Sequence, residues 1–546
     1  MSVIGSASVR RLSLCVVAAL CACAVGACSA EESAPAEAPK VAAEATPAAP
    51  APAPESVKPE AAAPGAAAPL PADAKVHPCA GAGRWFPPDA DHLGKLVDAY
   101  LQNPPTDVGG KPAALIVPHA GYQFSGSIAG KAFAALKGQT YRRVILMGLS
   151  HRAPIEGASV LCAGAYETPL GRIPVDAAAR DALLACPVVK EQPAAHEGEH
   201  SVENQLPLLQ RAIGKFAMVE LLVGDLSDAQ RATLADALRP LIDAETLLVA
   251  SSDFTHYGPN YGYVPFRDRV PESLRVLNDM AVAKITQIDL PGWDGYLKRT
   301  RDTVCGRNAI GLLLKVVEPW DDVRAARVAA DMSGAQTGDY ANSVTYASIV
   351  LWRAGKGLTE AEQETLLRLA RETVAHFLKT GEPLKPDAAK YDLTAALKAR
   401  GAAFVTLKNA GRLRGCIGHI TAVMPLYQSI IENACQACKD HRFVDNPISA
   451  KEEPSLQVEI SVLTPMRRLY DLEKIEIGRD GLVMTRGRQR GVFLPQVPGE
   501  QGWNREQYLV NLCGKAGLPN DAYKDPETEI YSFSAQVFHE PEAAAK

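Results

Sequence analysis

The chain has 546 residues, of which 47% are hydrophobic and 22% are charged, so a wholly disordered or collagen-like protein is excluded. At roughly 100–200 residues per domain, this length predicts two to four domains. The net charge is −5, and residues 75–546 carry only −2 of it, which argues against a nucleic-acid binder that relies on a basic field.

The N-terminus has the pattern of an export signal. Two arginines precede an uncharged apolar run from Leu12 to Ala27, which is too short for a comfortable membrane span. The run ends in Val25-Gly26-Ala27-Cys28, which resembles a bacterial lipobox. We therefore expect residues 1–27 to be a lipoprotein signal peptide and Cys28 to be the lipidated residue of an exported, membrane-anchored protein. Ser29 favours the outer membrane, and simple secretion is the alternative.

Residues 28–75 read as a tether. Between Ala34 and Asp73, 27 of 40 residues are Ala or Pro, and no apolar pattern is present that a core could bury. Proline stiffens such a segment toward an extended polyproline conformation. We expect a spacer that holds the globular part away from a membrane surface.

A first globular unit is predicted over residues 76–355. Four short aliphatic runs have the length and composition of buried strands. They lie at residues 114–117, 144–147, 218–223 and 247–250. Helical stretches such as residues 228–242 separate them, so we expect an α/β domain with a largely parallel sheet flanked by helices.

Polar side chains follow three of these strands. His119 and His151 come after the first two, and Asp253 and His256 come after the last. Ligands of open α/β sheets bind beyond the carboxyl ends of the strands, and neutral imidazole suits iron, copper and zinc. These residues therefore indicate a metal site, although each histidine alone is more typical of an ordinary loop.

Two further segments carry reactive side chains. Cys305 precedes an apolar helical stretch at residues 309–317, and a position near a helix N-terminus and Arg307 favours its thiolate. The alternative is a small buried thiol. Residues 196–203 concentrate histidines and carboxylates, among them His200 and Glu203. Here the alternative is a solvated loop before a helix that begins near Asn204.

Together these motifs resemble the Memo family. They are Pro118-His119-Ala120-Gly121-Tyr122, Gly148-Leu149-Ser150-His151, Glu199-His200-Ser201-Val202-Glu203, Ser251-Ser252-Asp253-Phe254-Thr255-His256 and Thr303-Val304-Cys305-Gly306-Arg307. The resemblance implies a fold similar to class III extradiol ring-cleavage dioxygenases, with a metal, iron or copper, held by two histidines and one cysteine.

Carried onto this chain, the resemblance assigns the metal to His119, His151 and Cys305. It places Asp253 and His256 beside the metal, where we expect them to act as acid and base. We assign Tyr122, His200 and Glu203 to the substrate pocket. A cysteine in place of the dioxygenase carboxylate shifts the metal preference and the redox behaviour.

A second unit is predicted over residues 356–540. Thr359 and Glu362 form a capping box for a helix that Gly381 ends. Residues 403–407 and 413–420 predict a hairpin, residues 456–463 a strand, and residues 508–516 a helix. The pattern is that of a smaller α+β domain.

Cys416 is the chemically suggestive residue of this second unit. It lies between two glycines, with Arg414 before it and His419 after it, as a nucleophile or a ligand could. We assign Cys416 a catalytic role and Arg414 a pocket role, and the alternative is a plain strand thiol. The pair Cys435 and Cys438 is expected to fill helical space or form an incidental disulfide rather than bind zinc.

The second unit resembles the Ammecr-type domain. The matching segments are Leu413-Arg414-Gly415-Cys416-Ile417-Gly418, Asp440-His441-Arg442-Phe443, Glu459-Ile460-Ser461-Val462-Leu463 and Gly491-Val492-Phe493-Leu494-Pro495-Gln496-Val497. Memo-like and Ammecr-type proteins are components B and A of the AmmeMemoRadiSam system, so the resemblance also implies a functional link to a radical SAM protein.

The leading hypothesis is a membrane-tethered, dioxygenase-like redox protein that uses iron(II), or else copper, on an unknown small substrate. A second hypothesis is a non-catalytic metal-binding or adaptor lipoprotein. A third is a thiol hydrolase or transferase that uses Cys416. No nucleic-acid partner is expected.

Overall fold

The computed structural model describes residues 75–541, apart from residues 107, 356 and 387–389. The predicted signal peptide, Cys28 and residues 28–74 of the predicted tether lie outside the described residues. Within the described ranges, every helix is too short or too polar to cross a bilayer.

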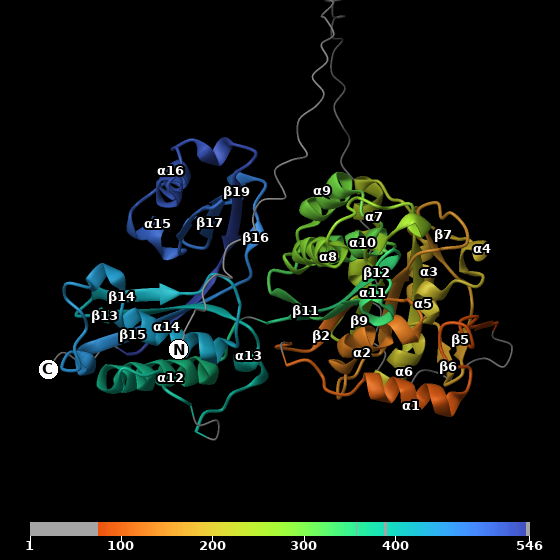
Figure 1. The fold of residues 1–546 in the computed structure, drawn as a ribbon, viewed down its shortest axis with the longest axis horizontal. Helices are drawn as coiled ribbons and strands as arrows, with labels where there is room; N and C mark the ends of the chain where they lie inside the picture. The colour runs from red at the N-terminus through yellow and green to blue at the C-terminus, as the bar shows by residue number, and fades with distance from the viewer. Residues whose placement is uncertain (1–74, 107, 356, 387–389, 542–546) are drawn as a thin grey trace, which may run out of the picture. The chain divides into compact units, whose positions relative to one another are not determined.

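The first domain is built around a nine-stranded sheet with the order β10-β12-β2-β9-β3-β8-β4-β7, and β11 pairs with β12 (Figure 1). Its strands are β2 (Pro112–Val117), β3 (Arg143–Gly148), β4 (Ala158–Val160), β7 (Val189–Glu191), β8 (Ala217–Val223), β9 (Thr246–Ser251), β10 (His256–Tyr257), β11 (Val323–Met332) and β12 (Ser343–Arg353). The four predicted strands are confirmed as β2, β3, β8 and β9.

The prediction of a largely parallel sheet holds for these four strands and for the pair of β4 and β7. β2, β9, β3 and β8 pair in parallel, whereas β12 is antiparallel to β2, β10 and β11, and β4 is antiparallel to β8. β11 and β12 form a hairpin around the short helix α11 (Ser333–Thr337), and β11 contains Arg, Ala and Asp in place of an aliphatic run. The sheet is therefore mixed.

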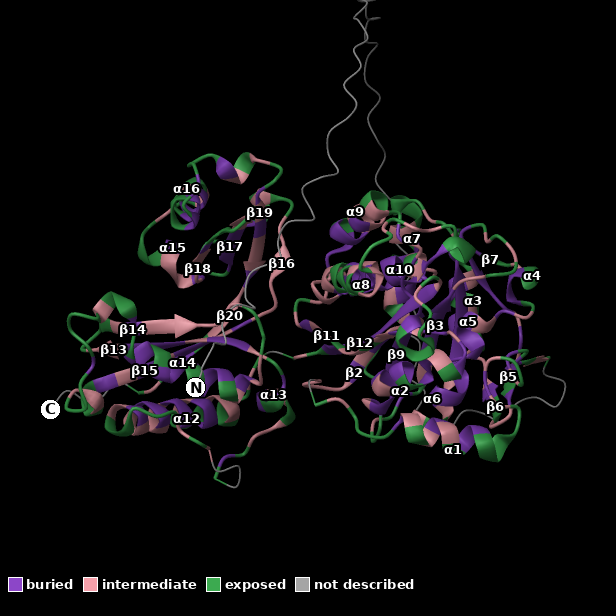
Figure 2. Ribbon diagram, in the orientation of Figure 1, coloured by how far each residue is buried: buried purple, intermediate pink, exposed green. Residues whose placement is uncertain are grey.

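Helices cover both faces of this sheet because strand side chains alternate between two cores. Leu115 and Val117 face one core, and Ala114 and Ile116 face the other. The first core packs against α1 (Ala90–Tyr100), α2 (Ser127–Ala134) and α6 (Leu206–Ile213). The second packs against α3 (Ala177–Leu184), α7 (Asp228–Leu238), α8 (Val270–Thr286), α9 (Leu290–Thr300) and α10 (Arg307–Val317). Figure 2 shows the central strands as buried.

Two smaller features complete this domain. β1 (Val76–Pro78), β5 (Ala165–Thr168) and β6 (Gly171–Pro174) form a separate three-stranded sheet. The helix predicted over residues 228–242 ends at Leu238 and continues as a 3-10 turn, since Pro240 cannot donate the next helical hydrogen bond.

The second domain contains two antiparallel four-stranded sheets. The first has the order β14-β13-β15-β20 and the second β16-β19-β17-β18. Their strands are β13 (Ala402–Asn409), β14 (Arg412–Gly418), β15 (Leu456–Leu463), β16 (Arg467–Arg468), β17 (Gly481–Arg486), β18 (Gln489–Phe493), β19 (Glu529–Phe533) and β20 (Ala535–His539). The predicted hairpin is confirmed as β13 and β14.

The helices of the second domain are α12 (Glu360–Thr380), α13 (Ala395–Lys398), α14 (Leu426–Cys438), α15 (Gln496–Glu500) and α16 (Arg505–Ala516). The capping box of Thr359 and Glu362 is present at the start of α12, as predicted. Cys435 and Cys438 are buried free thiols of α14. They therefore fill helical space, in agreement with the first of the two roles expected for them.

Candidate metal centre

The candidate centre lies where parallel strands end. β2, β9 and β3 are neighbours in the sheet, and their carboxyl ends meet at one edge. His119 follows β2, His151 follows β3 and Asp253 follows β9. The structure therefore brings these predicted site residues together, because a parallel sheet aligns the ends of its strands.

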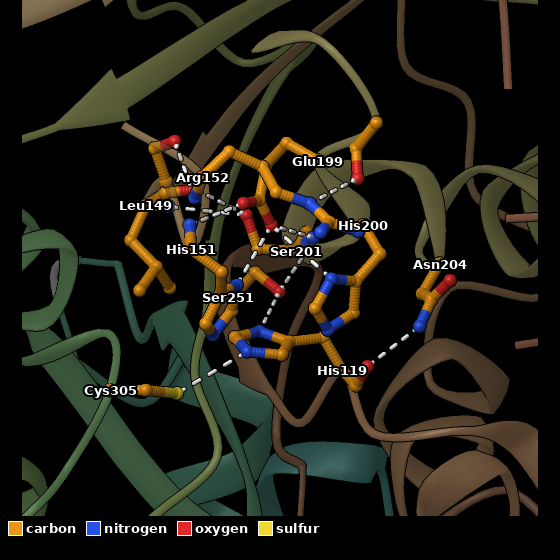
Figure 3. A network of polar contacts seen from close by, with 12 residues as sticks. His119, Leu149, His151, Arg152, Glu199, His200, Ser201, Asn204, Ser251 and Cys305 are labelled. Atoms are coloured by element: carbon orange, nitrogen blue, oxygen red, sulfur yellow. Dashed lines mark hydrogen bonds and ion pairs between the residues drawn. The ribbon is translucent and has the colours of Figure 1, made fainter. Parts of the chain in front are cut away.

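Three imidazoles converge here (Figure 3). One ligand atom from each of His119, His151 and His200 lies within 4.8 Å of the others. His200 comes from the one-turn helix α5 (His200–Glu203). His119 is buried, whereas the His151 side chain is 33% exposed. The cluster is therefore open to solvent on the side of His151.

His119 also belongs to a second set of possible metal ligands. Ligand atoms of His119, Asp253 and Cys305 also lie within 4.8 Å of one another. The Sγ atom of Cys305 is 3.3 Å from Nε2 of His119. An ion beside His119 would therefore have imidazole donors on one side and a thiol with a carboxyl group on the other, a set that suits iron, copper or zinc.

The orientation of His119 is set by three contacts. Its Nδ1 atom is 2.9 Å from Oγ of Ser251, which leaves Nε2 directed at Cys305. Its backbone N–H donates to Asp253, and its carbonyl accepts from Asn204. Burial, with the neighbouring His151, lowers the pKa of His119 to about 3. The ring is therefore neutral, which is the form that binds a metal.

His200 and His151 share the carboxylate of Glu199. Oε1 of Glu199 is 3.0 Å from Nδ1 of His151 and 3.5 Å from Nδ1 of His200. Although burial opposes it, the hydrogen bonds from His151 lower the pKa of Glu199 to about 2. The ring of Trp85 stacks on His200 with centroids 4.2 Å apart. Glu199 and Trp85 were not predicted as site residues.

The predicted thiolate of Cys305 is not supported. Burial raises the pKa of Cys305 above its usual range, and the charge of Asp253 raises it further. The guanidinium group of Arg307 lies 3.4 Å from Asp225 and so is directed at a carboxylate instead of the thiol. In the metal-free protein the thiol is therefore protonated, and a bound cation would be the group that ionises it.

Close backbone approach positions two parts of the centre. A Cβ atom at Gly306 would lie 2.5 Å from the carbonyl oxygen of Ser251, and one at Gly148 would lie 2.6 Å from Oγ of Ser201. Glycine at these positions lets the start of α10 reach the end of β9, and lets α5 reach the end of β3. Cys305 and His200 are thereby brought beside the strand-end residues.

Asp253 and His256 lie at the same edge. Burial raises the pKa of Asp253, and its Oδ1 atom accepts from the backbone N–H groups of His119 and Ala120. Nδ1 of His256 lies 3.0 Å from the carbonyl oxygen of Phe254, so Nδ1 carries the proton and Nε2 is the basic nitrogen. Both residues are therefore suited to proton transfer.

Two predicted pocket residues are directed away from the imidazoles. Tyr122 is 3% exposed and its hydroxyl donates to the carbonyl of Asn204. Glu203 accepts from the backbone N–H of Gly81 and lies 3.4 Å from Nε2 of His77. Their contacts stabilise the core and the segment before α1.

The two predicted site residues of the second domain lie on β14. Arg414 donates to Glu452. Sγ of Cys416 accepts from the hydroxyl of Thr406 at 3.3 Å, and burial raises the pKa of Cys416. These contacts favour the alternative of a strand thiol.

The segment at residues 196–203 is not a solvated loop, since His196, Glu199 and Glu203 are buried. His196 lies between two polar partners, with Nδ1 2.9 Å from Glu220 and Nε2 2.8 Å from Oγ of Ser159. The one sequence feature that could have indicated a buried polar network here is the clustering of histidines and carboxylates in this segment. For Trp85 no sequence pattern pointed to the site.

Comparison with known proteins matches two family models. A model described as Memo-like protein matches residues 77–350, and one described as AMMECR1 matches residues 367–538. A protein of Methanothermobacter thermautotrophicus is 43% identical over 192 residues, which are 34% of this chain and 96% of the relative. Protein MK0488 of Methanopyrus kandleri is 41% identical over 201 residues, 34% of this chain and 93% of the relative. The crystal structure of PH0010 from Pyrococcus horikoshii is 39% identical, with a TM-score of 0.31, and covers 32% of this chain and 90% of that chain.

Proposed function

Because the chain belongs to the Memo-like protein family and carries an AMMECR1 domain as well, we propose that it is a metal-dependent redox protein with dioxygenase-like chemistry. The observation that carries this proposal is the convergence of His119, His151 and His200 beside the thiol of Cys305. The donors fit a redox-active metal, since all three are imidazoles and the adjacent thiol is soft. Iron(II) is the first candidate, and copper is the second.

The proposed ligands are His119, His151 and Cys305, with His200 as a further imidazole donor. When bound, the metal supplies a redox-active, Lewis-acidic centre. Asp253 and His256 act as acid and base toward a small substrate, which enters past the exposed edge of His151. The position of the centre beyond parallel strand ends supports a fold relationship to the class III extradiol dioxygenases.

The proposal includes the cellular setting. The apolar run before Cys28 supports export and lipidation, which would anchor the chain in a membrane, and Ser29 supports the outer membrane. The pairing of the two domains supports a functional link to a radical SAM protein. Metabolic labelling with a fatty acid tests the anchor: the wild type should be labelled, and Cys28→Ala should not.

Metal analysis of anaerobically purified protein tests the central claim. The wild type should contain about one iron or copper per chain, and Cys305→Ala and His119→Ala should lose it. Metal-dependent oxygen consumption on a panel of small aromatic and aliphatic substrates should follow the metal content. Tight metal binding without oxygen consumption would favour the non-catalytic alternative. Retention of the metal by both variants would contradict the site.

A further inference from the structure

One buried carboxylate contacts two of the three clustered imidazoles. We propose that Glu199 is a positioning residue that holds His151 and His200 in a single orientation and tautomer, with Nε2 of each ring directed into the centre. This inference rests on the proposed metal site but concerns a residue outside its donor set.

The contacts of Glu199 suit a positioning role. Its side chain is fully buried, and Oε1 lies 2.7 Å from the backbone N–H of Ser201, 3.0 Å from Nδ1 of His151 and 3.5 Å from Nδ1 of His200. Oε2 accepts from the backbone N–H of His151. An ionised carboxylate only accepts hydrogen bonds, so Nδ1 of His151, which is hydrogen-bonded to it, carries the proton. Nδ1 of His200 makes no hydrogen bond, but the carboxylate charge 3.5 Å away favours a proton on that nitrogen. The Nε2 lone pairs are then left for a metal.

Two neighbouring rings fix the plane of His200. Trp85 stacks on one face with a centroid distance of 4.2 Å and an interplanar angle of 10°. His151 stacks with a centroid distance of 4.6 Å and an angle of 23°. Stacking sets the plane of the ring but does not decide which nitrogen faces the centre. Glu199 supplies that choice, because it lies beside Nδ1.

The same domain contains a second buried glutamate–histidine pair, Glu220 and His196, in which both ring nitrogens of the histidine already have partners. Glu220 contacts Nδ1 of His196 at 2.9 Å, much as Glu199 contacts His151. Nε2 of His196 is already occupied by Ser159 at 2.8 Å. Loss of Glu220 should therefore cost stability without an effect on metal binding, which makes Glu220→Gln the control for Glu199→Gln.

The first test needs no metal. Long-range ¹⁵N–¹H NMR of the histidine side chains reports the tautomer of each ring in the apoprotein. The signals of the two rings are assigned by their loss in His151→Gln and His200→Gln. In the wild type and in Glu220→Gln, we expect both rings to carry the proton on Nδ1. In Glu199→Gln, at least one ring should shift to the Nε2-protonated form or to a mixture. Unchanged tautomers in Glu199→Gln would overturn the proposal.

The second test measures Fe(II) affinity under anaerobic conditions by competition with a chromophoric chelator. Glu199→Gln should weaken binding by about 10–100-fold, as loss of an outer-shell partner does, and Glu199→Asp should recover part of it. Glu220→Gln should stay within about 3-fold of the wild type, a smaller change than an outer-shell loss. Equal weakening by both glutamine variants would overturn the positioning role. If the wild type binds neither Fe(II) nor, in the same assay, copper, the proposed function fails, and the tautomer measurement still decides the role of Glu199.

Discussion

The Sγ atom of Cys305 lies 3.3 Å from Nε2 of His119, although 186 residues separate the two in the chain. His119 follows β2, and Cys305 precedes α10, whose first turn packs against the end of β9 through Gly306. β2 and β9 are paired neighbours. The contact is therefore a product of the sheet order, which joins a strand-end imidazole to a helix-start thiol.

Replacement of Cys305 by serine should affect the affinity for copper more than the affinity for iron. A thiolate is a soft ligand, so Cys305→Ser should lower Cu(I) affinity by at least about 10-fold and Fe(II) affinity by less. Competition titrations with chelators for each metal measure both. Cys162→Ser is the matched control, since Cys162 is also a partly exposed free thiol of the first domain. Equal losses for both metals in Cys305→Ser would argue against thiolate ligation.

Gly306→Ala should disturb the same contact through the backbone. The added Cβ would lie 2.5 Å from the carbonyl oxygen of Ser251, so the start of α10 must move. We expect a loss of about 1–3 kcal/mol in the free energy of unfolding, as overpacking causes, together with weaker metal binding. Urea unfolding and metal titration measure the two effects.

Gly295→Ala is the control for this change. Gly295 lies within α9, where an added Cβ would meet only the end of the flexible Arg299 side chain. Removal of a helical glycine should raise stability by about 0.5–1 kcal/mol and leave metal binding unchanged. A Gly306→Ala variant that behaves like Gly295→Ala would show that the close approach is not required.

Sequence patterns predicted the strands well, because buried aliphatic runs such as residues 144–147 have few alternatives. They also predicted that His119 and His151 would meet, since parallel strands align their ends. The antiparallel β11 was missed because its residues are small and charged. Trp85 was missed because no local pattern marks it. Glu199 lies in a predicted motif, but its role was missed because that role depends on three-dimensional neighbours.

Trp85 offers an optical signal for the centre. Its ring stacks on His200 at 4.2 Å, so a paramagnetic metal bound by the imidazoles should quench its fluorescence. In Trp85→Phe, Fe(II) or Cu(II) should bind but should no longer quench the remaining emission. Trp352→Phe is the control, and its quenching should match the wild type. Persistent quenching in Trp85→Phe would place the metal elsewhere.

Ser159, His196 and Glu220 have the hydrogen-bond order of a serine hydrolase triad, yet they are 0%, 1% and 5% exposed. Burial makes the network structural. A fluorophosphonate probe should therefore not label Ser159 in the native protein. Ser159→Ala should lower the free energy of unfolding by about 1–3 kcal/mol, because Nε2 of His196 loses its partner. Labelling that disappears in Ser159→Ala would reveal access that the structure does not show.

Asp440 should make the second domain sensitive to acid. Burial acts to raise the pKa of this carboxyl group, but hydrogen bonds from Arg442 and from the backbone N–H of Cys416 lower it to about 2. A lowered pKa contributes stability above the unfolded value of about 3.9, and this contribution is lost as the pH falls toward 2. Asp440→Asn should therefore lower the free energy of unfolding by roughly 1–2 kcal/mol at pH 7 and by about half as much at pH 3.

Urea unfolding, followed by pulsed hydrogen exchange of the β13–β14 peptides, measures the difference at each pH. The exposed Asp445 provides the control, since Asp445→Asn should change stability by less than about 0.5 kcal/mol. A cost in Asp440→Asn that stays constant from pH 7 to pH 3 would mean that the carboxylate charge contributes nothing and that only the shape of the side chain matters.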